Sequence, residues 1–192
     1  MSRLITFGCS NTYGQGLVDR EKNVWGACVS RALNRQHVNM GVPGSSNKYI
    51  AYNITKFEFL KEDLVLILWT FPERYTKIIS EEDKYNFLPN FKDGQNDELN
   101  EVYYSYIFSY PDSDFDNRCY MNFSLYHLQN SGIKFYNLFI RSEFIKFIDN
   151  KENIIPHDFK TFYHKYPKGT DDLHLGDEGH IEFSKAIVDY LS

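Results

Sequence analysis

The amino-acid sequence predicts an α/β fold of three layers, in which helices cover both faces of a central parallel sheet. Short apolar stretches typical of buried strands alternate along the chain with stretches of helical periodicity. The most continuous apolar run, residues 64–69 (LVLILW), lies between two helical stretches, as a strand buried on both faces does. The 192 residues suit one hydrophobic core, so we predict a single domain over residues 1–192.

The first half of the chain predicts three strands and two helices in alternation. Each predicted strand is a short apolar stretch, and glycine closes the first two: residues 3–8, 37–40 and 64–69. The predicted helices carry apolar side chains three and four positions apart: residues 24–33, and a segment that Ser45 or Ser46 can cap and that extends through Phe59.

The second half begins with a less regular stretch. From Tyr75 to about Asp116 the periodicity weakens, and we interpret these residues as an insertion. Residues 99–110 fit one face of a helix better than a strand, although alternate aromatic side chains from Tyr104 to Tyr110 also fit a strand. The regular pattern then returns, with predicted elements as follows: a helix at residues 118–129, a strand at 134–140 and a final helix at 178–191.

Charge and cysteine content argue against several functional classes. The net charge is −5 with Lys and Arg scattered, so the sequence lacks the basic footprint of nucleic-acid binding. The N-terminal apolar stretch is too short for a signal peptide, and no run of about 18 apolar residues predicts a membrane span. The three cysteines have neither disulfide-framework nor metal-site spacing. We expect a cytoplasmic protein, with association with a virus particle left open and no prediction of oligomeric state.

Both ends of the chain carry groups suited to nucleophilic catalysis. Ser10 lies in the polar loop after the first strand, at the sheet edge where parallel sheets gather ligands. A serine hydroxyl needs a base to take its proton, and a carboxylate must orient that base. Asp171 and His174 are three residues apart just before the last helix, and Asp172 is a rival orienter at shorter spacing. These residues predict a Ser-His-Asp triad.

These blocks resemble the SGNH or GDSL-type esterases and lipases. Residues 7–14 (FGCSNTYG) match the first family block with Cys9 at its Asp position, and residues 39–44 match the second, with Gly44 as its oxyanion glycine. Asp171 and His174, followed by a Gly-His pair at residues 179–180, match the last block. The resemblance implies the flavodoxin-like SGNH hydrolase fold, with Ser10 as nucleophile and the Ser10 and Gly44 N–H groups in the oxyanion hole.

The third block departs from the family pattern. Family members have an Asn after the central strand that completes the oxyanion hole, whereas residues 69–74 read WTFPER and place Phe71 at that position. We consider Thr70, Arg74 and Asn11 as replacements, with Thr70 assigned to the oxyanion hole and Asn11 and Arg74 to substrate binding. An ion pair between Arg74 and a carboxylate such as Glu73 is an equally good interpretation of that arginine.

The resemblance implies hydrolysis of a carboxylic ester through the triad, with no cofactor or metal. The family acts on lipids, simple esters and O-acetylated sugars, and the lack of a greasy lid-like segment favours a small polar ester such as an O-acetylated carbohydrate. The alternative is a non-catalytic or acyltransferase protein of the same fold that binds a glycan or a protein. A phosphate or nucleotide binder ranks last because neither GxGxxG nor a GKS/GKT signature is present.

Several other residues have simpler structural interpretations. Aromatic side chains from Tyr103 to Tyr110 could stack on a sugar, but such stripes usually belong to a core. Cys9 and His180 are expected to be buried structural residues. His157 and His164 are seven positions apart with no cysteine nearby, which is not a zinc signature.

Overall fold

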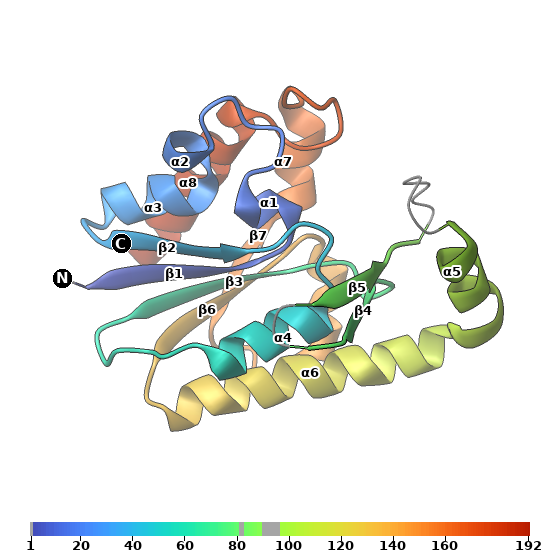
Figure 1. Cartoon of the computed structure of the whole chain (residues 1–192). Coiled ribbons are helices and arrows are strands. Elements are labelled where there is room, and N and C mark those ends of the chain that lie inside the picture. Colours follow the sequence, from blue (N-terminus) through green and yellow to red (C-terminus); the bar gives the residue numbers. More distant parts are fainter. Residues whose placement is uncertain (1, 81–82, 90–96) are drawn as a thin grey trace.

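The computed structural model describes residues 2–80, 83–89 and 97–192. Five parallel strands form one sheet in the order β2-β1-β3-β6-β7, and helices cover both of its faces (Figure 1). The strands are β1 (Arg3–Gly8), β2 (Gln36–Gly41), β3 (Leu64–Trp69), β6 (Lys134–Phe139) and β7 (Ile154–Asp158). The predicted three-layer α/β fold is confirmed.

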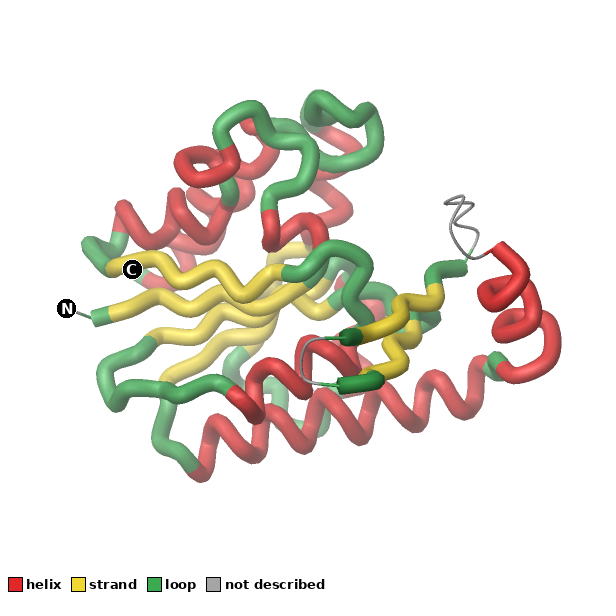
Figure 2. Tube along the Cα trace, in the orientation of Figure 1, coloured by secondary structure: helices red, strands yellow, loops and turns green. Residues whose placement is uncertain are grey.

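Different helices cover each face of the sheet, as Figure 2 shows. On one face pack α3 (Trp25–Ala32), α7 (Phe159–Lys165) and α8 (Asp177–Leu191). The other face carries α4 (Asn47–Lys56) and the long α6 (Tyr110–Asn130). Among the helices of the described segments, none has both the length and the apolar character that crossing a membrane requires.

The central strand β3 shows why both layers are needed. All six of its side chains are buried. Leu64, Leu66 and Leu68 belong to the core against α3 and α8, whereas Val65, Ile67 and Trp69 belong to the core against α4 and α6. Successive side chains of a strand point to opposite faces, so a continuous apolar run fits only a sheet covered on both sides.

The strand order places a crevice at the carboxyl ends of β1 and β3. The chain passes from β1 to β2 on one side and then to β3 on the other side of β1. Helices that follow neighbouring strands toward opposite faces leave a crevice at such a switch point, which is where open parallel sheets bind ligands. The loop with Ser10 follows β1, and the loop with Phe71 and Arg74 follows β3.

The predicted insertion contains a hairpin and two short helical segments. Strands β4 (Tyr75–Ile78) and β5 (Lys84–Phe87) pair antiparallel, and α5 (Asp97–Val102) leads into a π-helical turn at Tyr103–Ile107. The helical interpretation of residues 99–110 is therefore confirmed up to Ile107. The interpretation of its aromatic side chains as core is wrong for Tyr106 and Tyr110, which are 84% and 67% exposed. Residues 81–82 and 90–96 of the predicted insertion lie outside the described residues.

Three elements differ from the predictions. The helix expected at residues 118–129 begins at Tyr110, because Ser109 caps it by accepting the Asp112 N–H at 3.3 Å. The helix expected to reach Phe59 ends at Lys56. Strand β7 was not predicted, because Pro156 interrupts it; proline is tolerated there because β7 is an edge strand with an irregular register.

The smaller elements connect these layers. They are α1 (Ser10–Tyr13), α2 (Arg20–Asn23) and a 3-10 helix at Ser142–Phe147.

An ion pair fastens the start of β1 to the loop before β3, and it should make stability depend on pH. Arg3 Nη2 and Nε lie 2.5 and 2.9 Å from the two oxygens of Asp63, whose side chain is 1% exposed. Burial raises the pKa of Asp63, but hydrogen bonds from Arg3 and from the Leu60 N–H outweigh it, so the pKa lies below its usual value.

Because the folded pKa is lowered, Asp63 contributes stability above its unfolded pKa and loses it as the pH falls through the folded pKa. Asp63→Asn should lower the free energy of unfolding by about 1.5–3 kcal/mol at pH 7 and by less at pH 3, measured by urea unfolding at both pH values. Asp149→Asn, which breaks an exposed pair with Arg118, is the matched control and should change stability by less than about 1 kcal/mol. An equal loss at both pH values for Asp63→Asn would contradict this role.

Candidate active site

Ser10 lies where β1 ends and the short helix α1 begins. Its side chain is 4% exposed, and its Oγ lies 3.9 Å from the sulfur of the buried Cys9. The Thr12 and Tyr13 N–H groups donate to the Cys9 carbonyl and fix this turn. Ser10 occupies the first helical position, where a backbone N–H has no partner within the helix. That N–H can donate to a ligand beside the hydroxyl.

Asp171 and His174 form a fixed pair in the loop between α7 and α8. His174 Nδ1 lies 2.6 Å from Asp171 Oδ2, and the Leu173 and His174 N–H groups donate to Oδ1 at 3.0 and 2.9 Å. Burial raises the pKa of Asp171, but these hydrogen bonds outweigh it and hold the pKa below its usual value. Asp171 therefore stays a carboxylate and orients the ring, which leaves Nε2 available. The structure pairs His174 with Asp171 and not with the rival Asp172.

The two chain ends meet at shared cavities. Ser10 and His174 both line a cavity of about 390 Å³ and a neighbouring one of about 250 Å³. Within the described part of the chain, no hydrogen bond joins Ser10 Oγ directly to His174. Catalytic hydrogen bonds often tighten only when substrate binds, so this separation is compatible with a catalytic pair.

Gly16 holds the loop after α1 against the loop that carries Asp171. The Thr170 N–H donates to the Gly16 carbonyl at 2.8 Å. Gly16 has a φ of +84°, and a Cβ on it would lie 2.7 Å from Asp171 Oδ1. Glycine is therefore needed at this position both for its backbone conformation and for the close approach to Asp171.

The Gly16→Ala variant should lower kcat because the added methyl group displaces the Asp171 carboxylate. We expect a decrease of at least about tenfold, together with a loss of about 1–3 kcal/mol of stability from the left-handed backbone. Steady-state kinetics and urea unfolding measure the two effects. Gly132→Ala is the control: Gly132 has a φ of +68° but no atom within 4 Å of an added Cβ, so it should lose stability alone. Unchanged turnover in Gly16→Ala would show that Asp171 tolerates displacement.

Gly44 lines the larger cavity from the loop after β2, and the β4–β5 hairpin supports it. The φ of Gly44 is +73°, and a Cβ on it would lie 3.0 Å from Asn86 Nδ2 of β5. Next to it, the Ser46 N–H donates to Thr76 Oγ1 of β4 at 3.2 Å, and Thr76 donates to Asn86 Oδ1 at 2.9 Å. The Gly44 N–H has no acceptor among the residues that the structure describes. It is available to a ligand in the cavity.

The three residues considered as replacements for the missing Asn have different surroundings. Thr70 is fully buried and lines neither cavity. Its N–H donates to Asn47 Oδ1 at 2.8 Å, and its Oγ1 accepts a hydrogen bond from Arg74 at 3.2 Å. The structure therefore does not bring Thr70 to the oxyanion site, and its hydroxyl positions Arg74 instead. Asn11 lines the smaller cavity, and Arg74 lines both. The Asn11 Oδ1 atom is buried and has no hydrogen-bond partner in the part of the chain that the structure describes.

Phe71 and two arginines occupy the place of the family's third block. The guanidinium carbons of Arg74 and Arg141 lie 5.1 and 5.4 Å from the Phe71 ring centroid, and both arginines line both cavities. The structure gives Arg74 no ion pair with Glu73 within the described residues. Arg141 was missed from the sequence, although it directly follows the predicted strand at residues 134–140 and so lies at the ligand-binding edge.

The pKa of the Cys9 thiol lies below its usual value. Burial raises the pKa of Cys9. The positive charge of Arg74 and hydrogen bonds involving Thr70 and Asn11 lower this pKa, and their combined effect is the larger one. Cys9 is buried, as predicted. His180 is also buried, and its Nδ1 accepts the Trp25 N–H at 3.2 Å, which confirms a structural role.

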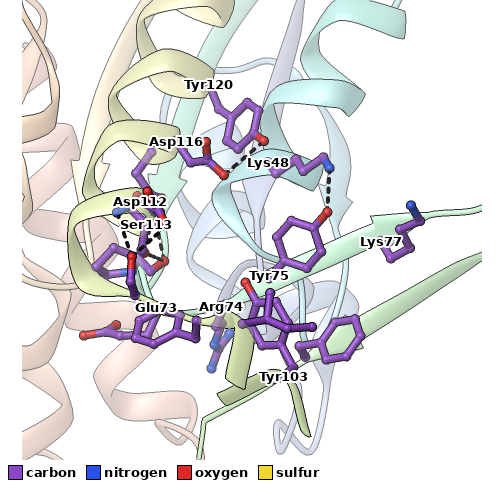
Figure 3. Close-up of a pocket in the computed structure, with 16 residues that line it drawn as sticks. Lys48, Glu73, Arg74, Tyr75, Lys77, Tyr103, Asp112, Ser113, Asp116 and Tyr120 are labelled. Atoms are coloured by element: carbon purple, nitrogen blue, oxygen red, sulfur yellow. Dashed lines mark hydrogen bonds between the residues drawn. The ribbon is translucent and has the colours of Figure 1, made fainter. Parts of the chain in front are cut away.

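A third cavity of about 530 Å³ adjoins the larger Ser10 cavity (Figure 3). The two share Glu73 and Arg74. Its walls combine aromatic rings with charged groups, among them Lys48, Tyr75, Tyr103, Asp116 and Tyr120. Tyr75 and Tyr103 stack at a centroid distance of 5.3 Å, Lys48 Nζ donates to the Tyr75 hydroxyl at 3.2 Å, and burial raises the pKa of Tyr120 to about 12.

The two histidines considered for metal binding lie in different elements. His157 lies in β7 and His164 in α7. Across residues 2–80, 83–89 and 97–192, no group of three or more His, Cys, Asp or Glu side chains is arranged to hold a metal ion.

Comparison with known proteins shows similarity at the level of structure. No protein-family model matches the chain, and no curated protein matches it. A G-D-S-L family protein from Desulfitobacterium hafniense DCB-2 has a TM-score of 0.57 at 10% identity, covering 97% of this chain and 98% of its own. A member of the lipolytic protein G-D-S-L family from Veillonella parvula DSM 2008 has a TM-score of 0.54 at 13% identity, covering 98% and 97%.

A third similar structure is that of an enzyme whose name gives its substrate, acetyl xylan. The acetyl xylan esterase Est2A from Butyrivibrio proteoclasticus has a TM-score of 0.55 at 12% identity; the match covers 99% of this chain and 63% of the esterase. Together with the parallel sheet, these similarities show that the chain has the SGNH hydrolase fold.

Proposed function

We propose that this chain, which has the SGNH hydrolase fold, is a serine hydrolase that cleaves carboxylic esters with Ser10, His174 and Asp171. The observation that carries the proposal is that Ser10 and His174, from opposite ends of the chain, line the same two cavities, while Asp171 holds His174 Nδ1 at 2.6 Å. The fold alone does not fix an activity, so the argument depends on these side chains.

The proposed reaction proceeds in two steps. His174 Nε2 takes the Ser10 proton as Oγ attacks the ester carbonyl carbon, and the N–H groups of Ser10 and Gly44 stabilise the negative oxygen of the tetrahedral intermediate. The C–O bond to the alcohol breaks as His174 returns the proton to that oxygen. Water then attacks the acyl-enzyme with His174 again as base, which releases the acid and restores Ser10. Asp171 keeps the ring in the required tautomer.

We assign the third oxyanion donor to Asn11. It lines the smaller cavity beside Ser10, and its buried Oδ1 atom has no hydrogen-bond partner among the described residues. Exchanging the amide oxygen and nitrogen positions, which are assigned from hydrogen bonding, presents the NH₂ group in place of the unpaired oxygen.

Asn11→Ala should reduce kcat by about 10²–10³-fold with little change in KM, as the loss of an oxyanion donor does. Asn23→Ala, remote from the cavities and bonded to Asp177, is a suitable control that should retain kcat. Steady-state kinetics with 4-nitrophenyl acetate distinguish the two. If KM rises while kcat is retained, Asn11 binds substrate in its ground state and the donor assignment is wrong.

We further propose an O-acetylated carbohydrate as substrate. The 530 Å³ cavity beside the Ser10 cavity supplies what sugars require, namely aromatic rings for stacking and charged groups for hydroxyls (Figure 3). The structural similarity to an acetyl xylan esterase supports the same substrate class.

A fluorophosphonate probe tests the catalytic proposal. We expect labelling of the native protein and none of Ser10→Ala, with Ser131→Ala, an exposed serine, labelled normally. Acetate release from acetylated sugars and hydrolysis of short-chain 4-nitrophenyl esters then compare substrate classes. Absence of labelling in a folded sample would instead favour a non-catalytic protein of this fold, for which Phe71 in place of the family's Asn is the supporting observation.

A further inference from the structure

We propose that the natural substrate carries a negative charge near the scissile ester, held by Arg74 and Arg141 in the cavities that Ser10 and His174 line. This proposal rests on the proposed ester hydrolysis and adds the chemical class of the substrate, an anionic ester. Arg141 has no part in the triad or the oxyanion hole, so its presence in both cavities calls for another role.

The lining of the smaller cavity is unusually positive for an acidic protein. Arg74, Arg141 and Lys160 all line it, and none of the described residues around it is Asp or Glu. In the larger cavity the two arginines face one carboxylate, that of Glu73. The whole chain has a net charge of −5, so this local excess of cations runs against the overall composition. A cleft lined by one sign of charge concentrates ligands of the opposite sign.

Neither arginine is neutralised by a buried partner. Among the described residues, the Arg74 side chain makes one hydrogen bond, to the neutral hydroxyl of Thr70 at 3.2 Å. Within the same part of the chain, Arg141 has one acidic partner, Glu143 at 3.4 Å, whose carboxylate is 65% exposed. The Arg141 Nε atom is itself buried and has no acceptor within the described residues. A buried donor without an acceptor is costly, so this guanidinium keeps unused hydrogen-bonding capacity beside the cavity.

Phe71 provides a common support for the two guanidinium groups. Both lie within 5.4 Å of its ring centroid, a distance at which cations interact favourably with an aromatic ring. Arg74 follows β3 and Arg141 follows β6, which are neighbouring strands, so the sheet fixes their separation. Planar guanidinium groups held in this way match the geometry of a carboxylate, whereas lysine acts as a point charge.

The charge can belong to either half of the ester, and matched substrates distinguish the two sources. For the acyl half, mono-4-nitrophenyl succinate is compared with 4-nitrophenyl butyrate. For the alcohol half, an O-acetylated methyl glucuronoside is compared with the corresponding methyl glucoside. We expect kcat/KM to favour the anionic member of at least one pair by about tenfold or more, because hydrogen bonds to charged groups are worth roughly that much.

In the matching variants, Arg141→Gln and Arg74→Gln should lower kcat/KM for the anionic substrate at least about tenfold more than for the neutral one. Arg141→Lys should restore part of the preference, because it keeps the charge without the planar fork. Arg31→Gln, on the exposed surface of α3, controls for overall charge and should retain the preference. Two results would overturn the proposal while leaving ester hydrolysis intact. One is equal kcat/KM for the anionic and neutral substrates in both pairs. The other is a preference for the anionic substrate that stays unchanged in both arginine variants.

Binding provides a readout that needs no hydrolysis. Methyl glucuronoside and succinate, compared with methyl glucoside and butyramide, are titrated calorimetrically into native protein and Arg141→Gln. Tighter binding of either anion to the native protein, lost in the variant, would support the charge site even if every ester is left uncleaved and the proposed function fails. Equal binding of charged and neutral ligands would count against the site whatever the activity.

Discussion

Replacing Ser10 with alanine should lower kcat for ester hydrolysis by about 10⁴-fold or more, the largest single effect that we expect. In the proposed reaction the hydroxyl oxygen forms the acyl-enzyme, and among the described residues that line both cavities Ser10 alone carries a hydroxyl group. In serine hydrolases, removal of the nucleophile leaves only the residual catalysis that the oxyanion hole and substrate binding supply.

The Ser10→Ala variant should fold normally, because within the described segments the Ser10 hydroxyl makes only a long side-chain contact, to the Cys9 sulfur at 3.9 Å. Its thermal unfolding midpoint therefore serves as the control for structure, and single-turnover kinetics measure the chemistry. If the variant retains more than about a tenth of the native kcat, Ser10 is not the nucleophile and the triad assignment fails.

Asp171→Asn should lower kcat by about 10⁴-fold, the second largest effect. An amide at this position cannot favour the tautomer with a proton on Nδ1 as the carboxylate does, so His174 can no longer take the Ser10 proton at Nε2. The Leu173 and His174 N–H groups still find an oxygen in Asn, so the loop geometry should persist.

The matched control is Asp172→Asn, because Asp172 is the next residue and the ion pair of His174 is with Asp171. It should change kcat less than about threefold. The pH dependence adds a second test: because the pKa of Asp171 is lowered, its carboxylate should remain charged throughout the neutral range, and its titration should cause no loss of activity there. Equal losses in both variants would mean that Asp172 shares the orienting role.

The residues of the proposed triad were accessible to sequence reasoning because their signals are local. Ser10 follows an apolar strand and a glycine, and Asp171 and His174 are three residues apart before a helix. The strand and helix periodicities that predict the parallel sheet also place these loops at one edge of it. The spatial meeting of the two chain ends then follows from topology, since β1 lies within the sheet and α8 packs beside it.

Other parts of the site could not be obtained from sequence patterns. Arg141 is a single arginine after a strand, and only the alignment of β6 beside β3 brings it to Phe71. Thr70 has the right residue type for an oxyanion donor, but its side chain faces inward, toward Arg74. The start of α6 at Tyr110 was signalled by the Ser109 cap and by Pro111, yet the weak apolar periodicity of that stretch concealed it.

The β4–β5 hairpin links the 530 Å³ cavity to the loop that carries Gly44. Successive side chains of a strand point to opposite sides. On one side of the hairpin, the paired residues Tyr75 and Phe87 line the 530 Å³ cavity. On the other side, the paired residues Thr76 and Asn86 contact the loop that carries Gly44. An evolutionary change that reshapes one side of this ribbon is transmitted to the other. New specificity at this cavity would therefore have to arise together with compensating changes around Ser46, and the hairpin should diversify more slowly than an ordinary surface loop.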